Sequence, residues 1–214
     1  AVAEPPDAPL ADMSLREFIQ TVAARSSAPG GGSVSAAMAA MGAGLGAMMA
    51  KLTFGVRKFE ELDSRMRAVI PPLHETARAL IPMIDADTSA FNQYMRGLKM
   101  PKETEAQRAA RKDQMQAGLE TATQVPLETM RLADRAWDAL CDVARYGNIT
   151  CKSDAQVGAR ALEAGIWGAW QNVRINAAGL ADADIKAGIL AEAEALAARA
   201  TEQCARVLAI LDER

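Results

Sequence analysis

An acidic residue stands in an apolar stripe near the middle of the chain. Residues three or four positions apart form this stripe: Leu80, Ile84, Asp87, Phe91, Tyr94 and Leu98. The spacing predicts a helix with Asp87 on its core face. A carboxyl in that position must be paired, hydrogen-bonded or neutral. If burial raises its pKa, Asp87 can donate and accept protons near neutral pH.

A structural role for Asp87 stays open, because the carboxyl could cap a neighbouring helix or pair with a core Arg or Lys. Asp85 lies two positions away and therefore points to nearly the opposite face of the helix. The two acids are not expected to form a carboxylate pair.

Three consecutive glycines precede a long uncharged segment and supply a second candidate element. Gly30, Gly31, Gly32 and Ser33 stand where a helix is expected to begin, with Ser33 as its N-cap. Backbone amides at such a start could bind an anion or a flat ring. No Lys-Ser/Thr pair follows and no strand precedes, which disfavours a nucleotide loop. A tight turn is the alternative.

Two further groups of polar residues could contact a ligand. Asn172 and Asn176 end a face of small residues and could form a ligand wall; helix packing, with the amides bonded to loop carbonyls, is the alternative. The second group comprises polar residues around a predicted loop, Asn148, Lys152, Ser153 and Asp154. It also includes three cations that could meet a carboxylate ligand, Lys51, Arg57 and Lys58. Ordinary solvated charges are the alternative for the cations.

The elements that must position these residues all read as helices. The chain is rich in Ala and Met and shows no alternating strand pattern, which predicts an all-α, up-and-down bundle of about six helices. Helices are expected over residues 15–25, 33–53, 71–98, 153–177 and 183–211, and over 103–145 with a bend or interruption at Pro126. Small residues at Gly42, Gly46 and Ala50 predict close helix packing.

Composition excludes several classes of protein. The net charge of -3 favours neither nucleic acid nor an anionic membrane as partner. Three scattered cysteines and one histidine predict a reducing, cytoplasmic location and no metal site. The uncharged residues 34–50 are short and Ala/Gly-rich for a membrane span, so a buried helix is expected. Residues 1–12, with three prolines, are expected to be a linker before a domain at 13–214.

Five segments, in order, resemble the cyclodeaminase domain of the formiminotransferase-cyclodeaminase family. They are residues 27–49 (SAPGGGSVSAAMAAMGAGLGAMM), 52–63 (LTFGVRKFEELD), 81–95 (IPMIDADTSAFNQYM), 146–165 (YGNITCKSDAQVGARALEAG) and 172–180 (NVRINAAGL). The wider family includes a stand-alone methenyltetrahydrofolate cyclohydrolase. By motif, the family's catalytic aspartate falls on Asp87.

The resemblance implies a dimeric helical enzyme of histidine degradation. It would convert 5-formiminotetrahydrofolate to 5,10-methenyltetrahydrofolate and ammonia, without a cofactor. The full protein would carry a formiminotransferase domain, assemble into a larger homo-oligomer and use polyglutamylated folate. Cyclohydrolase activity, or a non-catalytic helical oligomerisation module, is the alternative.

Overall fold

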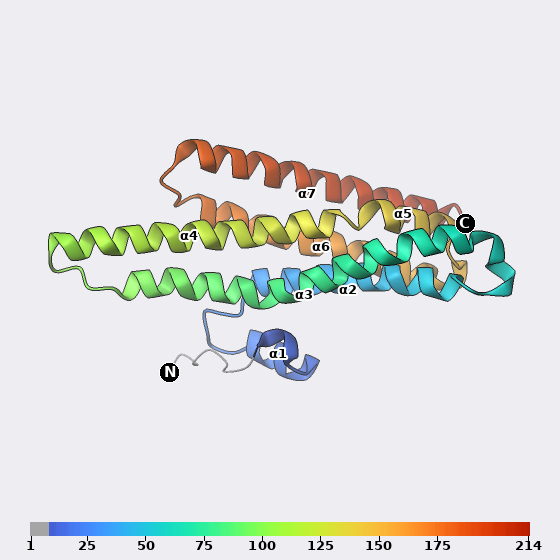
Figure 1. Cartoon of the computed structure of the whole chain (residues 1–214), viewed down its shortest axis with the longest axis horizontal. Coiled ribbons are helices and arrows are strands. Elements are labelled where there is room, and N and C mark those ends of the chain that lie inside the picture. The colour runs from blue at the N-terminus through green and yellow to red at the C-terminus, as the bar shows by residue number, and fades with distance from the viewer. Residues whose placement is uncertain (1–8) are drawn as a thin grey trace.

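The computed structural model describes residues 9–214, and every regular element within them is helical. Four long helices form an up-and-down bundle, with α5 and α7 packed beside it (Figure 1). The α-helices are α1 (Leu15–Val22), α2 (Gly31–Thr53), α3 (Asp63–Lys99), α4 (Glu105–Asp134), α5 (Trp137–Tyr146), α6 (Lys152–Ala177) and α7 (Ala183–Asp212). Short 3-10 turns are η1 (Leu10–Asp12), η2 (Arg57–Leu62) and η3 (Ile149–Cys151). The predicted all-α bundle is confirmed.

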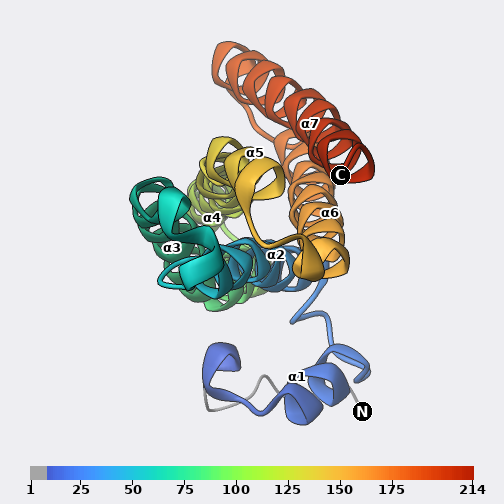
Figure 2. The ribbon, with the colours of Figure 1, turned by 90° about the vertical axis from the view of Figure 1, so that its right-hand side faces the viewer.

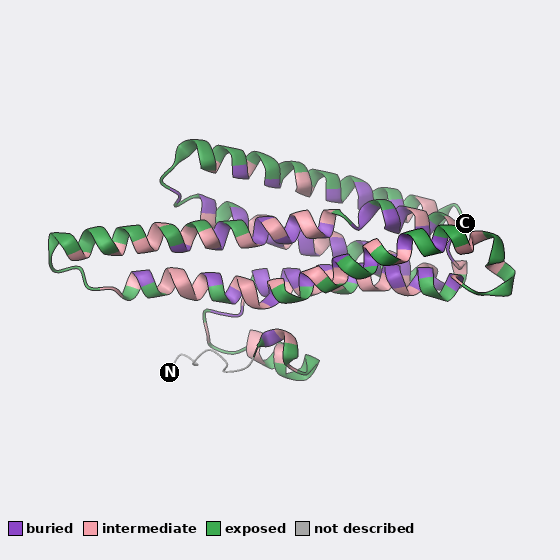
Figure 3. Cartoon of the chain, in the orientation of Figure 1, coloured by how far each residue is buried: buried purple, intermediate pink, exposed green. Residues whose placement is uncertain are grey.

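Helix α2 is the central element of the bundle. It packs between α3 and α6, and most of its inward residues are buried (Figures 2 and 3). Its length and composition would also suffice to cross a membrane. However, 56% of its most apolar 18-residue stretch is buried against the rest of the chain. The predicted buried helix is therefore present.

Glycines in α2 allow its backbone to touch α6. A Cβ atom built on Gly42 would lie 2.7 Å from the Gly158 carbonyl oxygen and 2.7 Å from the Leu162 nitrogen. A Cβ on Gly46 would lie 2.9 Å from Leu140 and 3.2 Å from Leu73. The close packing predicted for this face is confirmed, and its partners lie in the same chain.

Prolines do not divide the helices where the sequence predicted. Helix α3 begins at Asp63, not at Pro71, and continues through Pro71, Pro72 and Pro82. Helix α4 likewise runs through Pro126 and ends only at Asp134. A proline removes one hydrogen bond from a helix, and burial of residues on both sides of it offsets that loss.

Several predicted helix ends also shift. Helix α1 ends at Val22, short of the predicted residue 25. Gly30 is the N-cap of α2, so Ser33 lies within its first turn. Helix α6 begins at Lys152, one residue ahead of the predicted start at residue 153.

The N-terminal segment is attached to the bundle at one point. Leu10 is buried against Ala36 and Ile84, and the N–H groups of Leu10 and Ala11 donate to the Asp85 carboxylate. Asp85 therefore points away from Asp87, as predicted. Most of the expected linker, residues 1–8, lies outside the described residues. Helix α1 lies beside the bundle and has no fully buried residue, but its Phe18 packs against the small cluster formed by Leu10, Ala36 and Ile84 (Figure 2).

Replacing Gly42 with Ala tests the contact between α2 and α6. The added methyl would collide with backbone atoms, so we expect Gly42→Ala to lower the free energy of unfolding by about 1–3 kcal/mol, measured by urea denaturation. Gly44 is in the same helix with no neighbour within 4 Å of its Cβ position. Gly44→Ala should raise stability by about 1 kcal/mol. Equal effects of the two substitutions would contradict this packing.

Candidate active site

A cavity of about 480 Å³ lies where α2 begins. Helices α3, α4 and α6 extend beyond this end of α2 and supply most of the walls (Figure 1). The size is within the range of small-molecule sites. Its lining residues are Ser27, Ala28, Gly30, Gly31, Asp87, Phe91, Tyr94, Leu119, Ala122, Asn172, Ile175, Asn176 and Gly179.

Among the described residues that line the cavity, Asp87 is the only one with an ionisable carboxyl, and one of its oxygens is held by α2. The Ser33 N–H donates to Asp87 Oδ2 at 3.0 Å, and Ser33 Oγ lies 3.3 Å from the same oxygen. Ser33 Oγ is itself held by α3, because it also lies 2.8 Å from the Ile84 carbonyl oxygen and 3.1 Å from Thr88 Oγ1. Within the described chain, Asp87 Oδ1 has no hydrogen-bond partner.

The three glycines at this helix start differ in what a side chain at each position would contact. A Cβ on Gly32 would lie 2.0 Å from Asp87 Oδ1, so any side chain there would displace the carboxyl. A Cβ on Gly31 would lie 3.7 Å from Asn172 Nδ2, and one on Gly30 would meet nothing within 4 Å. The close approach anticipated for this loop is made by Asp87 itself.

Burial raises the pKa of Asp87 above its ordinary value of 3.8. Hydrogen bonds from the Ser33 hydroxyl and Ser33 N–H favour the charged carboxylate and partly offset that rise. The N-terminal end of α2, with its partial positive charge, faces the same carboxyl. The site therefore accommodates both the protonated and the ionised form of Asp87.

Asn172 and Asn176 line the opposite wall, as the predicted ligand wall requires. Asn172 Nδ2 donates to the Gly168 carbonyl at 2.8 Å, and Asn176 Nδ2 donates to the Ala122 carbonyl in α4 at 2.6 Å. The structure thus brings together Asp87, both asparagines and the glycine loop.

The remaining predicted site residues lie at the other end of the bundle. Gly32 and Lys51 are separated by most of α2, roughly 30 Å at 1.5 Å per residue. Lys51 and Arg57 are exposed there. Asn148 caps η3, and Lys152 lies 3.5 Å from Asp212. Ser153 and Asp154 follow Lys152 in the first turn of α6. Within a single chain, these residues are therefore remote from Asp87.

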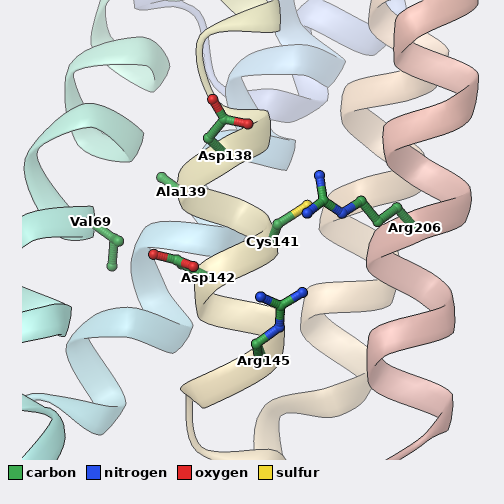
Figure 4. Close-up of a pocket in the computed structure, with 7 residues that line it drawn as sticks. All are labelled: Val69, Asp138, Ala139, Cys141, Asp142, Arg145 and Arg206. Carbon is green, nitrogen blue, oxygen red and sulfur yellow. The ribbon is translucent and has the colours of Figure 1, made fainter.

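A second pocket, between α5 and α7, is a weaker candidate (Figure 4). Its acids are engaged elsewhere, because Asp142 lies 3.7 Å from Arg65 and Asp138 lies 3.8 Å from Arg199. Burial raises the pKa of the Cys141 thiol, which lowers its reactivity. Among residues 9–214, no three His, Cys, Asp or Glu side chains are grouped as a metal site would need.

Comparison with known proteins identifies the family. The profile of the formiminotransferase-cyclodeaminase family matches residues 14–195. The chain belongs to this family. It is 44% identical over 208 residues to formimidoyltransferase-cyclodeaminase of Gallus gallus and 47% identical over 206 residues to that of Dictyostelium discoideum. These matches cover 97% and 96% of the chain, but only 38% and 37% of those relatives.

Two further relatives match over nearly their whole length. Methenyltetrahydrofolate cyclohydrolase of Methylorubrum extorquens is 36% identical over 187 residues, covering 87% of this chain and 90% of that protein. The crystal structure of formiminotetrahydrofolate cyclodeaminase from Thermotoga maritima superposes with a TM-score of 0.83 at 27% identity, covering 94% of this chain and 97% of that one. This cyclodeaminase-family chain is thus similar to enzymes of folate metabolism.

No prediction from the sequence placed α4 in the cavity wall. Leu119 and Ala122 line the cavity, although α4 carried no site prediction. The available signal was Pro126, which has no N–H to donate and so leaves the carbonyl four residues earlier in need of a donor from elsewhere.

Substitution of Gly32 tests whether α2 positions Asp87. Gly32→Ala would push the carboxyl from its place, and we expect any enzymatic turnover that uses Asp87 to fall about 100-fold. Gly188→Ala, in α7, adds a methyl with nothing within 4 Å and is the matched control. Wild-type turnover by folded Gly32→Ala protein would contradict this geometry.

The raised pKa of Asp87 predicts a pH-dependent loss of stability. The unfolded carboxyl ionises near 3.8, whereas the native one holds its proton to higher pH. Native stability therefore falls, relative to Asp87→Asn, as pH rises from 3.8 through the raised pKa, and the difference then levels off. Urea unfolding of both proteins between about pH 3 and pH 8 measures this. Parallel pH profiles would contradict the buried charge.

Proposed function

We propose that this chain is a formiminotetrahydrofolate cyclodeaminase with Asp87 as its acid–base group. The observation that carries the proposal is that one carboxyl lines the cavity among residues 9–214, with one oxygen held by Ser33 and the other without a hydrogen-bond partner among those residues. The relatives in Thermotoga maritima and Gallus gallus, whose names state this activity, support the assignment.

The reaction needs one proton removed and one proton delivered. N10 of the folate attacks the carbon of the protonated formimino group on N5 (N5–CH=NH₂⁺), which forms a carbon–nitrogen bond, closes a five-membered ring and leaves an amino group on that carbon. Asp87 accepts the N10 proton and gives a proton to the departing amino group. The carbon–amine bond then breaks, releasing ammonia and leaving the 5,10-methenyl cation. A carboxyl whose pKa lies above its ordinary value suits both transfers, and the proposed sequence calls on no cofactor.

Removing the acid should abolish most of the activity. Asp87→Asn keeps the size and the acceptor for Ser33 but cannot carry the proton, so we expect ammonia release from 5-formiminotetrahydrofolate to fall about 10²–10⁴-fold. Asp85→Asn is the matched control, because Asp85 bonds to the N-terminal segment and lies outside the cavity lining. Near-wild-type turnover by folded Asp87→Asn protein would refute the assignment.

Methenyltetrahydrofolate cyclohydrolase activity is the second candidate. It is favoured by the Methylorubrum extorquens relative, of which this chain covers 90%. In that reaction water adds to the methenyl carbon, and the same carboxyl could accept its proton. Ammonia release from the formimino substrate, compared with loss of methenyl absorbance in its absence, separates the two activities.

The setting of the reaction is also proposed from the relatives. Since the chain spans under two fifths of the curated formimidoyltransferase-cyclodeaminases, we infer that it acts beside a transferase domain, in cytoplasmic histidine degradation. Polyglutamylated folate and a homodimer within a larger assembly follow from the same resemblance. Lys51, Arg57 and Lys152 remain proposed contacts for carboxylates of such a long ligand.

A further inference from the structure

Pro126 leaves a backbone carbonyl free in the cavity wall. In a regular helix, the N–H of residue 126 would donate to the carbonyl of Ala122, but proline has no N–H. Asn176 fills the gap from α6, with its Nδ2 donating to the Ala122 oxygen at 2.6 Å. The side chain of Asn176 is thus held by the α4 carbonyl that Pro126 leaves without its helical hydrogen bond.

This contact fixes the orientation of the Asn176 amide. A carbonyl oxygen can only accept, so the amide group beside it must be the NH₂. Asn172 is oriented by the same logic, since its Nδ2 donates to the Gly168 carbonyl at 2.8 Å. Neither amide oxygen accepts a hydrogen bond from a described residue, and both residues line the cavity. The α6 wall therefore offers two acceptor oxygens.

The groups follow one another along the cavity. Asp87 lies against Gly32, and Asn172 lies against the position of Gly31. Asn176 is one helical turn farther along α6, about 5.4 Å, and reaches α4. The acceptor of Asn176 therefore stands about one helical turn, 5.4 Å, beyond that of Asn172 along the α6 wall.

We propose that Asn176 is a specificity-determining residue that accepts a hydrogen bond from the 2-amino group of the substrate's pterin. The inference rests on the proposed folate function and names the part of the folate that this wall recognises. With N5 and N10 at Asp87, the pyrimidine ring is directed toward Asn176. Its 2-amino and N3–H groups are donors, which match an acceptor held in place by Ala122.

The test compares two ligands that differ only at position 2. Pterin-6-carboxylate carries the 2-amino group, and 4-oxopteridine-6-carboxylate carries hydrogen there. Fluorescence titration of the full chain should show that the wild type binds the first about fivefold to tenfold more tightly, as one hydrogen bond in a partly buried site provides. In Asn176→Leu the two dissociation constants should become equal.

Two more variants separate recognition from support of the fold. Pro126→Ala returns an N–H to the Ala122 carbonyl and releases Asn176, so discrimination should fall while stability is kept. The double variant Pro126→Ala/Asn176→Leu leaves no carbonyl unpaired and should fold but not discriminate. Gln171→Leu removes an amide from α6 outside the cavity lining and should keep the wild-type ratio.

The possible negative results contradict different parts of the proposal. A folded Asn176→Leu or double variant that keeps the wild-type ratio overturns the role of Asn176, as does a wild type that binds both ligands equally. Those results leave ammonia release and Asp87 untouched. A wild type that binds neither pterin contradicts the folate assignment, and the inference with it.

Discussion

Backbone contact between α2 and α6 is the interaction on which the rest of the structure depends. Glycines supply it on both sides: a Cβ on Gly42 would strike α6, and Cβ atoms on Gly165 and Gly168 would lie 2.6 Å from the Ser35 carbonyl and 2.2 Å from the Ser35 hydroxyl. Two helices in backbone contact cannot readily slide along or rotate against each other, because protein interiors are close-packed. The start of α2 is thereby set against α3.

The fixed position of α2 determines the surroundings of Asp87. The Ser33 N–H meets one carboxyl oxygen and Gly32 makes room for the other. The same carboxyl is partly withdrawn from water, which raises its pKa, and is faced by the positive end of a helix dipole. The opposing influences keep the group able to exist in both protonation states, as a proton shuttle requires.

Much of this arrangement could be predicted from residue types and spacing. The helical stripe that carries Asp87 and the closely packed small-residue face of α2 could both be predicted from the sequence, and both are present. Local patterns could not show that packing would carry α3 through Pro71, or which end of the bundle each polar group would occupy. Asn148 and Lys152 look like site residues in sequence, yet a single chain leaves them a full helix length from Asp87.

The exposed start of α4 has a consequence for dynamics. Its first buried residue is Gly118, so residues 105–117 pair with the end of α3 without a deep core beneath them (Figures 1 and 3). Regions with few buried contacts open at low free energy, far below global unfolding. Amide hydrogens should therefore exchange progressively faster from the α2–α6 contact toward the α3–α4 tip. The cavity lies between the glycine-packed centre and that tip, so its α3 and α4 walls belong to a part of the bundle that opens at lower free energy than the α2–α6 contact.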